Sequence, residues 1–136
     1  MALSNIGGGR QVGDGNVDEV SLVTQGAPAT MTVTAAVTVA QLVTGIILGN
    51  PDSSAASYTL PTVALTEALL VNAKVDSAFD VSVINVDGSG SGVITMVAGT
   101  GWTLVGLVTL AATAGTTGRW RARKTGVGTW SLYRLA

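Results

Sequence analysis

Residues 79–85 read Phe-Asp-Val-Ser-Val-Ile-Asn, and this stretch decides the fold class. Its large apolar residues Phe79, Val81 and Val83 alternate with polar ones, which is the period of two that a half-buried β-strand shows. Because successive side chains of a strand point to opposite faces, we expect the ring and the valines to face a core and Asp80 to stay in contact with water. The stretch therefore predicts a strand with one buried face.

The same period returns near the C-terminal end. Trp120 and Ala122 alternate with Arg119, Arg121 and Arg123, so the apolar pair is expected on one face and three guanidinium groups on the other. We call the three arginines the arginine ridge. A row of guanidinium groups along one strand is either a solvated strand face or a contact surface, and in the second case carboxylates of a protein partner are its expected ligands.

Short runs rich in Val, Thr, Ile and Leu extend the strand pattern along the chain, and clusters of turn-forming residues separate them. Such spacing is typical of an all-β sandwich or barrel, and we predict a jelly-roll-like antiparallel β-sandwich. The expected turns lie at residues 49–52, 87–92, 99–101, 115–118 and 126–128, and the expected strands at residues 21–25, 29–39, 42–48, 57–60, 79–85, 93–98, 103–110, 119–124 and 129–135.

Two segments depart from the strand pattern. At residues 62–72, Thr62 offers a helix cap after Pro61 and apolar residues follow at helical spacing, so we predict one short helix. Residues 1–19 are rich in Gly, Asn and Asp and have few large apolar side chains, so we predict a flexible, extended N-terminal arm. The chain is then an arm followed by a β-sandwich domain at residues 20–136.

Charge is sparse and unevenly placed. Only 11% of the residues are charged against 47% hydrophobic ones, so we expect neighbouring molecules to cover much of the surface. No acid follows Asp87, whereas five of the seven basic residues do, so the two ends of the chain differ in sign. Opposite potentials within one small chain favour contacts between copies or with a protein partner. The five late basic residues are Arg119, Arg121, Arg123, Lys124 and Arg134.

The residue types argue against catalysis. The chain has no Cys and no His, which removes thiol nucleophiles, disulfides, the usual general base and the commonest metal ligands. It contains no phosphate-binding Gly-Lys-Ser/Thr motif, no dinucleotide fingerprint and no Gly-x-Ser-x-Gly elbow. The calcium-like spacing of Asp14, Asn16 and Asp18 lacks the glycine and the bidentate glutamate that such a loop needs. We expect no enzyme activity, no cofactor and no metal.

Nucleic acid and membrane are weaker alternatives as partners. The arginine ridge could contact phosphates while Trp120 or Trp130 stacked on bases, but a net charge of −1 argues against a nucleic-acid module. Residues 20–51 carry no charge and are long enough to cross a bilayer. However, Val and Ala alternate with Thr at residues 30–39, which favours a strand over a spanning helix. We predict neither partner.

Several stretches resemble small structural proteins of tailed-bacteriophage virions, in particular the β-rich capsid decoration, or cement, proteins. They are Tyr-Thr-Leu-Pro-Thr at residues 58–62, the stretch at residues 79–85, residues 98–106, and residues 121–125 with residues 132–135. The resemblance implies a jelly-roll-like subunit, usually a homotrimer, on the outer surface of the capsid. Such a subunit clamps neighbouring copies of the major capsid protein, and the resemblance transfers no catalytic residues.

The expected contact elements are the arm, with Arg10, and the arginine ridge with the neighbouring Trp120. Two alternatives remain for the function. One is a structural component of a tail or head fibre. The other is a carbohydrate-binding module on the virion surface, which would need an exposed tryptophan among Trp102, Trp120 and Trp130.

Overall fold

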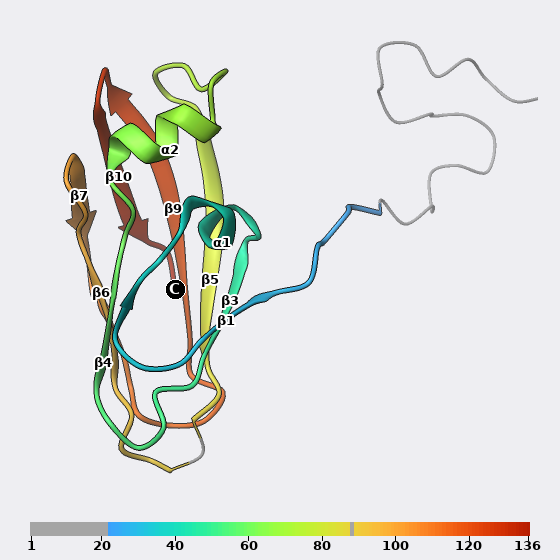
Figure 1. The fold of residues 1–136 in the computed structure, drawn as a ribbon, viewed down its shortest axis with the longest axis vertical. Coiled ribbons are helices and arrows are strands. Elements are labelled where there is room, and N and C mark those ends of the chain that lie inside the picture. Colours follow the sequence, from blue (N-terminus) through green and yellow to red (C-terminus); the bar gives the residue numbers. More distant parts are fainter. Residues whose placement is uncertain (1–21, 88) are drawn as a thin grey trace, which may run out of the picture.

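The computed structural model describes residues 22–87 and 89–136, and this part of the chain is mostly β (Figure 1). The arm predicted at residues 1–19 lies outside it. The described residues form ten strands and two short helices. In chain order these are β1 (Ala29–Met31), β2 (Ala35–Ala36), α1 (Val39–Val43), β3 (Ile46–Gly49), β4 (Ala56–Thr59), α2 (Val63–Leu69), β5 (Ala78–Asn85), β6 (Ile94–Val97), β7 (Trp102–Val105), β8 (Thr109–Leu110), β9 (Thr117–Gly126) and β10 (Thr129–Arg134).

The strands form two sheets, and the chain alternates between them. One sheet has six strands in the order β1-β3-β5-β9-β10-β7, and the other has four in the order β2-β4-β6-β8. Every strand from β1 to β9 is followed or preceded in the sequence by a strand of the other sheet, and only β9 and β10 are consecutive within one sheet. The chain therefore winds back and forth between the sheets along the length of the molecule (Figure 1).

This winding makes the sheets mixed, so the prediction of an antiparallel sandwich was wrong in its strand directions. Five of the eight strand pairings are parallel, including β1 with β3, β3 with β5, and β4 with β6. The chain leaves β1 for the other sheet and returns in β3, which runs in the same direction as β1 and pairs with it in parallel, and the same holds for β3 with β5 and for β4 with β6. The return from β6 to β8 is antiparallel instead. A purely antiparallel jelly roll has no such pairs.

The predicted turns lie between strands for most of their length, although Gly49 and Gly126 end β3 and β9 and residues 117–118 begin β9. Four of the five do not join strands that pair with each other. The turns at residues 49–52, 87–92, 99–101 and 115–118 each carry the chain from one sheet to the other. Only the turn at residues 126–128 closes a hairpin, between β9 and β10, with Gly128 at a φ of +69°. Regular spacing of turns alone does not separate hairpins from crossings between sheets.

One cluster of buried residues joins the two sheets. Val81 and Val83 of β5 are fully buried, and Phe79 packs against the same cluster, as the alternation at residues 79–85 predicts. The four-stranded sheet contributes Tyr58 and Ile94, both with no exposed surface. Both sheets therefore share a single core.

Four of the predicted strands are interrupted, shortened or missing. The strand predicted at residues 42–48 starts only at Ile46, because residues 42 and 43 belong to α1. Residues 29–39 form β1 in one sheet and β2 in the other, with the start of α1, because the chain crosses between the sheets after Met31. Residues 103–110 divide in the same way into β7 and β8, next to Gly106 at a φ of +94°. Residues 22–28, which include most of the first predicted strand, form no strand and run away from the body (Figure 1).

The described part of the chain has two helices where one was predicted. The predicted helix at residues 62–72 is confirmed as α2, and the Thr62 side chain accepts a hydrogen bond from the Leu65 N–H as expected of a cap. The second helix, α1, begins with a capping box. The Thr38 hydroxyl accepts from the Gln41 N–H at 3.1 Å, and the Gln41 side chain accepts from the Thr38 N–H at 2.9 Å.

Candidate interaction surfaces

The arginine ridge lies on the face of β9 that points away from the core. Arg119 and Arg121 are exposed, while Trp120 and Ala122 between and beside them are buried, as the alternation predicts. The antiparallel pairing of β5 with β9 sets Asp80 directly opposite Arg121. The sheet register therefore brings an acid of this chain onto the same face as the ridge.

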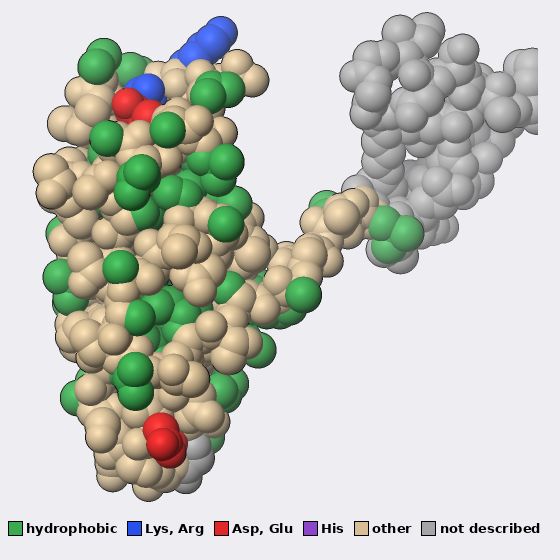
Figure 2. All heavy atoms as spheres, in the orientation of Figure 1, with side chains coloured by type: hydrophobic (Ala, Val, Ile, Leu, Met, Phe, Trp, Pro, Cys, Tyr) green, Lys and Arg blue, Asp and Glu red, His purple; other side chains and the backbone are tan. Residues whose placement is uncertain are grey.

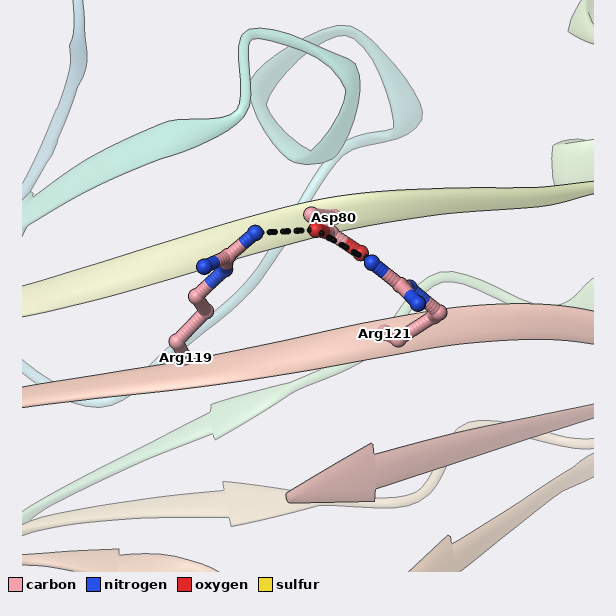
Figure 3. A network of polar contacts seen from close by, with 3 residues as sticks. All are labelled: Asp80, Arg119 and Arg121. Carbon is pink, nitrogen blue, oxygen red and sulfur yellow. Dashed lines mark hydrogen bonds and ion pairs between the residues drawn. The ribbon is translucent and has the colours of Figure 1, made fainter. Parts of the chain in front are cut away.

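Asp80 accepts hydrogen bonds from two arginines at once (Figure 3). Its carboxylate receives Nε and Nη2 of Arg121 at 2.7 and 3.0 Å, and Nη2 of Arg119 at 2.6 Å. These bonds lower the pKa of Asp80 to about 2, chiefly through Arg121 and then Arg119. Both arginine side chains keep about half of their surface exposed, at 51% and 53%. The centre of the ridge is therefore an ion-paired cluster open to solvent.

The third arginine of the ridge has its own acid. Arg123 donates from Nε to Asp76 Oδ1 at 3.0 Å, and its Nη1 donates to the Tyr133 hydroxyl at 3.3 Å. The nearby guanidinium lowers the pKa of Tyr133. We expected a partner to supply carboxylates to the ridge, and the structure shows that Asp76 and Asp80 of the same chain already do so. Three positive charges and two negative ones leave the surface with a small positive excess.

The three tryptophans face the core. Trp120 is 1% exposed, and the Arg134 guanidinium lies 4.5 Å from the centre of its ring. Trp102 and Trp130 are 7% and 1% exposed, with their ring centres 5.7 Å apart. In this structure Trp120 offers no ring face to a partner, although it was expected beside the ridge. The exposed tryptophan that a sugar site or a base-stacking platform would need is not found among these three.

A second charged group, which the sequence reading missed, fastens α2 to the end of the core. Lys124 Nζ lies 3.0 Å from Glu67 Oε1 and donates to the Ala73 carbonyl oxygen at 3.2 Å, and Trp130 Nε1 donates to the same Glu67 oxygen at 3.2 Å. The Lys124 bond lowers the pKa of Glu67. The signal was present, since Lys124 shares the core-facing parity of Trp120 and Ala122 on β9.

The face that carries α1 and α2 is nearly free of charge (Figure 2). Hydrophobic and uncharged polar side chains cover it along its length, and charged side chains gather only near its two ends. A groove of about 760 Å³ lies on it between the two helices and the ends of β4 and β6. None of the residues that line the groove is charged, and Leu65 and Leu69 of α2 are 60% and 53% exposed along it. This groove is larger than the apolar pocket of about 370 Å³ beside Phe79 and Trp130, and it is the candidate for an apolar contact.

Three further predictions concern Arg10, membrane crossing and metal binding. Arg10, a predicted contact residue, lies outside the described residues. Neither α1 nor α2 has the length and apolar character that a membrane crossing by a helix needs. Within residues 22–87 and 89–136, no three acidic side chains come together as a metal site would require. Comparisons of the chain with protein-family models, with curated proteins and with solved structures found no match.

Proposed function

We propose that this chain is a structural, non-enzymatic virion protein that binds the outside of a tailed-phage capsid and cements it by bridging major capsid protein subunits. The resemblance noted in the sequence supports the proposal, and its stretches belong to the folded body. Residues 58–62 end β4 and cap α2, residues 79–85 form most of β5, and residues 98–106 include β7. Residues 121–125 and 132–135 lie largely in β9 and β10.

The observation that carries the proposal is the separation of charged and uncharged surfaces. The arginine ridge lies on the outer face of the six-stranded sheet, whereas the groove lies among the uncharged side chains around α1 and α2. Covering an uncharged face removes no ion from water, so a protein neighbour can bury it without a large desolvation penalty. A subunit with one apolar and one charged surface suits a bridge between two different neighbours.

In this proposal the body is a β-sandwich whose two sheets share one core, and its rigidity lets many copies act together. A protein that binds the assembled shell but not its separated subunits stabilises the shell by linkage. Repetition around the shell multiplies modest contact energies by avidity. We propose a homotrimer as the unit that binds, with the arginine ridge directed at acidic groups on the shell. Trp120 is not among the proposed contacts, because its ring is buried.

The test compares virions that lack the chain with the same virions after the purified chain is added back. Heating releases DNA when a head opens, so the temperature of DNA release measures the stability of the shell. We expect the added chain to co-sediment with heads and to raise that temperature. A ridge variant with Arg119, Arg121 and Arg123 changed to Gln, and with Asp76 and Asp80 changed to Asn to avoid unpaired acids, should bind more weakly.

The matched control carries only the two Asp→Asn changes. If both variants bind heads as well as the natural chain, the ridge is not the contact to the shell. If the natural chain neither binds heads nor changes the temperature of DNA release, the cement function is refuted. Recovery of the chain with separated tails would instead support the fibre or tail alternative.

A further inference from the structure

The described chain begins with an exposed apolar segment that its own body leaves uncovered. Leu22 and Val23 are 88% and 87% exposed, and Figure 1 shows this end of the described chain running away from the two sheets. The neighbouring residues up to Asn50 carry no charge. Two adjacent large apolar side chains so fully exposed on a projecting segment are an unfavourable arrangement for an isolated molecule.

The base of this segment is fixed to the body. Gln25 donates from Nε2 to the Thr44 carbonyl oxygen at 2.7 Å, and Thr44 is the cap at the C-terminal end of α1. The groove, by contrast, is lined by Thr38 and Val39 at the other end of that helix. The hydrogen bond therefore sets where the segment leaves the body, and the segment departs from the end of α1 that lies away from the groove.

The groove has the size and chemistry to receive such a segment. Its volume of about 760 Å³ falls in the range of pockets that hold a ligand of a few residues. Its walls combine apolar side chains such as Leu65 and Leu69 with Thr59 and Thr100, and none of its lining residues is charged. A charged peptide would lose the hydration of its charges there without gaining an ion pair. The uncharged Leu-Val-Thr sequence has no charge to dehydrate, so it avoids that cost.

We propose that Leu22 and Val23 of one copy bind in the groove between α1 and α2 of a second copy of this chain. The contact is heterologous, because the segment and the groove are different surfaces, so repetition around a closed ring would satisfy every segment and every groove. The inference goes beyond the proposed virion role and does not depend on it. It identifies the contact between copies, and it leaves the arginine ridge free for another partner.

The first experiment measures the mass of the purified full chain by light scattering over a range of concentrations. We expect a mass above the 13.6 kDa of one copy. The segment variant Leu22→Asp/Val23→Asp and the groove variant Leu65→Asp should each lower the association constant by about tenfold or more, because each places a carboxylate in an apolar contact. Circular dichroism should show that both variants keep the natural β content.

Two control variants each add one carboxylate elsewhere, as the groove variant does. Val127→Asp changes a valine that is 94% exposed in the turn between β9 and β10, and Ala64→Asp changes the exposed residue next to Leu65 on α2, which does not line the groove. Both controls should associate as the natural chain does. A natural chain that is monomeric at every concentration, or segment and groove variants that associate as well as their controls, would overturn the inference.

The second experiment tests whether the two surfaces meet each other. Val23→Lys and Leu65→Glu are each expected to be largely monomeric, while an equal mixture should associate. In the mixture the unchanged segment of the Leu65→Glu variant meets the unchanged groove of the Val23→Lys variant, and the lysine and the glutamate can pair at the other contact. A mixture that stays monomeric would overturn the pairing of segment with groove. Both experiments use the purified chain alone, so their failure would leave the proposed binding to heads untouched, and failure to bind heads would leave this contact untouched.

Discussion

Replacing Asp80 by Asn tests whether the ion-paired cluster of β5 and β9 stabilises the fold. Asp80 is the shared acceptor for Arg119 and Arg121, and its pKa falls from 3.8 to about 2 in the folded chain. At about 1.4 kcal/mol per pKa unit, this difference sets an upper limit of roughly 2.5 kcal/mol on the stabilisation. The two arginines are half exposed, so screening by solvent reduces the expected loss in Asp80→Asn to about 1 kcal/mol at pH 7.

The pH dependence gives the sign of the effect. Because the folded pKa lies below the unfolded one, the stabilisation is present in full above pH 4 and is lost as the pH falls from about 4 through about 2. Urea unfolding followed by tryptophan fluorescence, at fixed protein concentration, measures the difference between Asp80→Asn and the natural chain. The difference should shrink strongly at pH 2 and in about 1 M salt, where the Debye length is near 3 Å.

Asp52→Asn is the control, since Asp52 is exposed and forms no salt bridge with the described residues. The reasoning would be refuted if Asp80→Asn were no less stable than Asp52→Asn at pH 7. It would also be refuted if the loss in Asp80→Asn stayed undiminished at pH 2, because a protonated Asp80 can no longer attract its arginines by charge.

Three further predictions concern stability and use the same unfolding assay. Gly99→Ala should destabilise the fold by about 2 kcal/mol or more, since the new Cβ would meet the backbone oxygens of Leu60 and Pro61, the latter at 2.6 Å. Gly26→Ala should change the stability little, because a Cβ there would have nothing within 4 Å, and equal losses for the two variants would contradict the prediction. Lys124→Met should destabilise the fold by leaving Glu67 without its charged partner, and Lys124→Met/Glu67→Gln should recover part of the loss. No recovery would argue against the ion pair. Tyr58→Phe should lower the free energy of unfolding by about 1 kcal/mol, since the hydroxyl donates to the Thr32 carbonyl oxygen at 2.8 Å. Tyr133→Phe, at a half-buried site, should lower it less, and the reverse order would count against the prediction.

The sequence predicted which face of a strand is buried better than it predicted which strands pair with each other. Alternation at residues 79–85 and around Trp120 gave the buried and exposed sides of β5 and β9 correctly, because the period of two depends only on the pleat. Strand pairing depends on where the chain goes after each turn, and a turn residue such as Gly101 has the same local signature whether it belongs to a hairpin or to a crossing. The mixed sheets could not be read from local spacing for this reason.

The helix at residues 39–43 was missed although its start signal was present. Thr38 and Gln41 have the spacing of a capping box, but the alternation of Thr with Val and Ala through residues 30–39 fits a strand equally well. Tertiary contacts decide between the helix and the strand. The chain crosses between the sheets there, and Leu42 becomes fully buried in the core from a helix.

For the candidate surfaces, the sequence indicated the arginine ridge but not its partners. The exposure of the three arginines follows from the pattern of β9, whereas their pairing with Asp76 and Asp80 requires the register of β5 against β9. The groove combines residues near positions 39, 65 and 98, which only the fold brings together. The absence of charge in the groove, however, agrees with the small fraction of charged residues in the whole chain.

The proposed role puts this chain on the outside of an assembled phage head. Antibodies raised against the purified chain and detected with gold particles on intact virions of the phage proposed to encode it would locate the chain on the particle. We predict gold over the heads at many positions on each particle, with tails unlabelled. Gold confined to tails or fibres, or virions that carry no label while the purified chain on the same grid does, would contradict the proposed role.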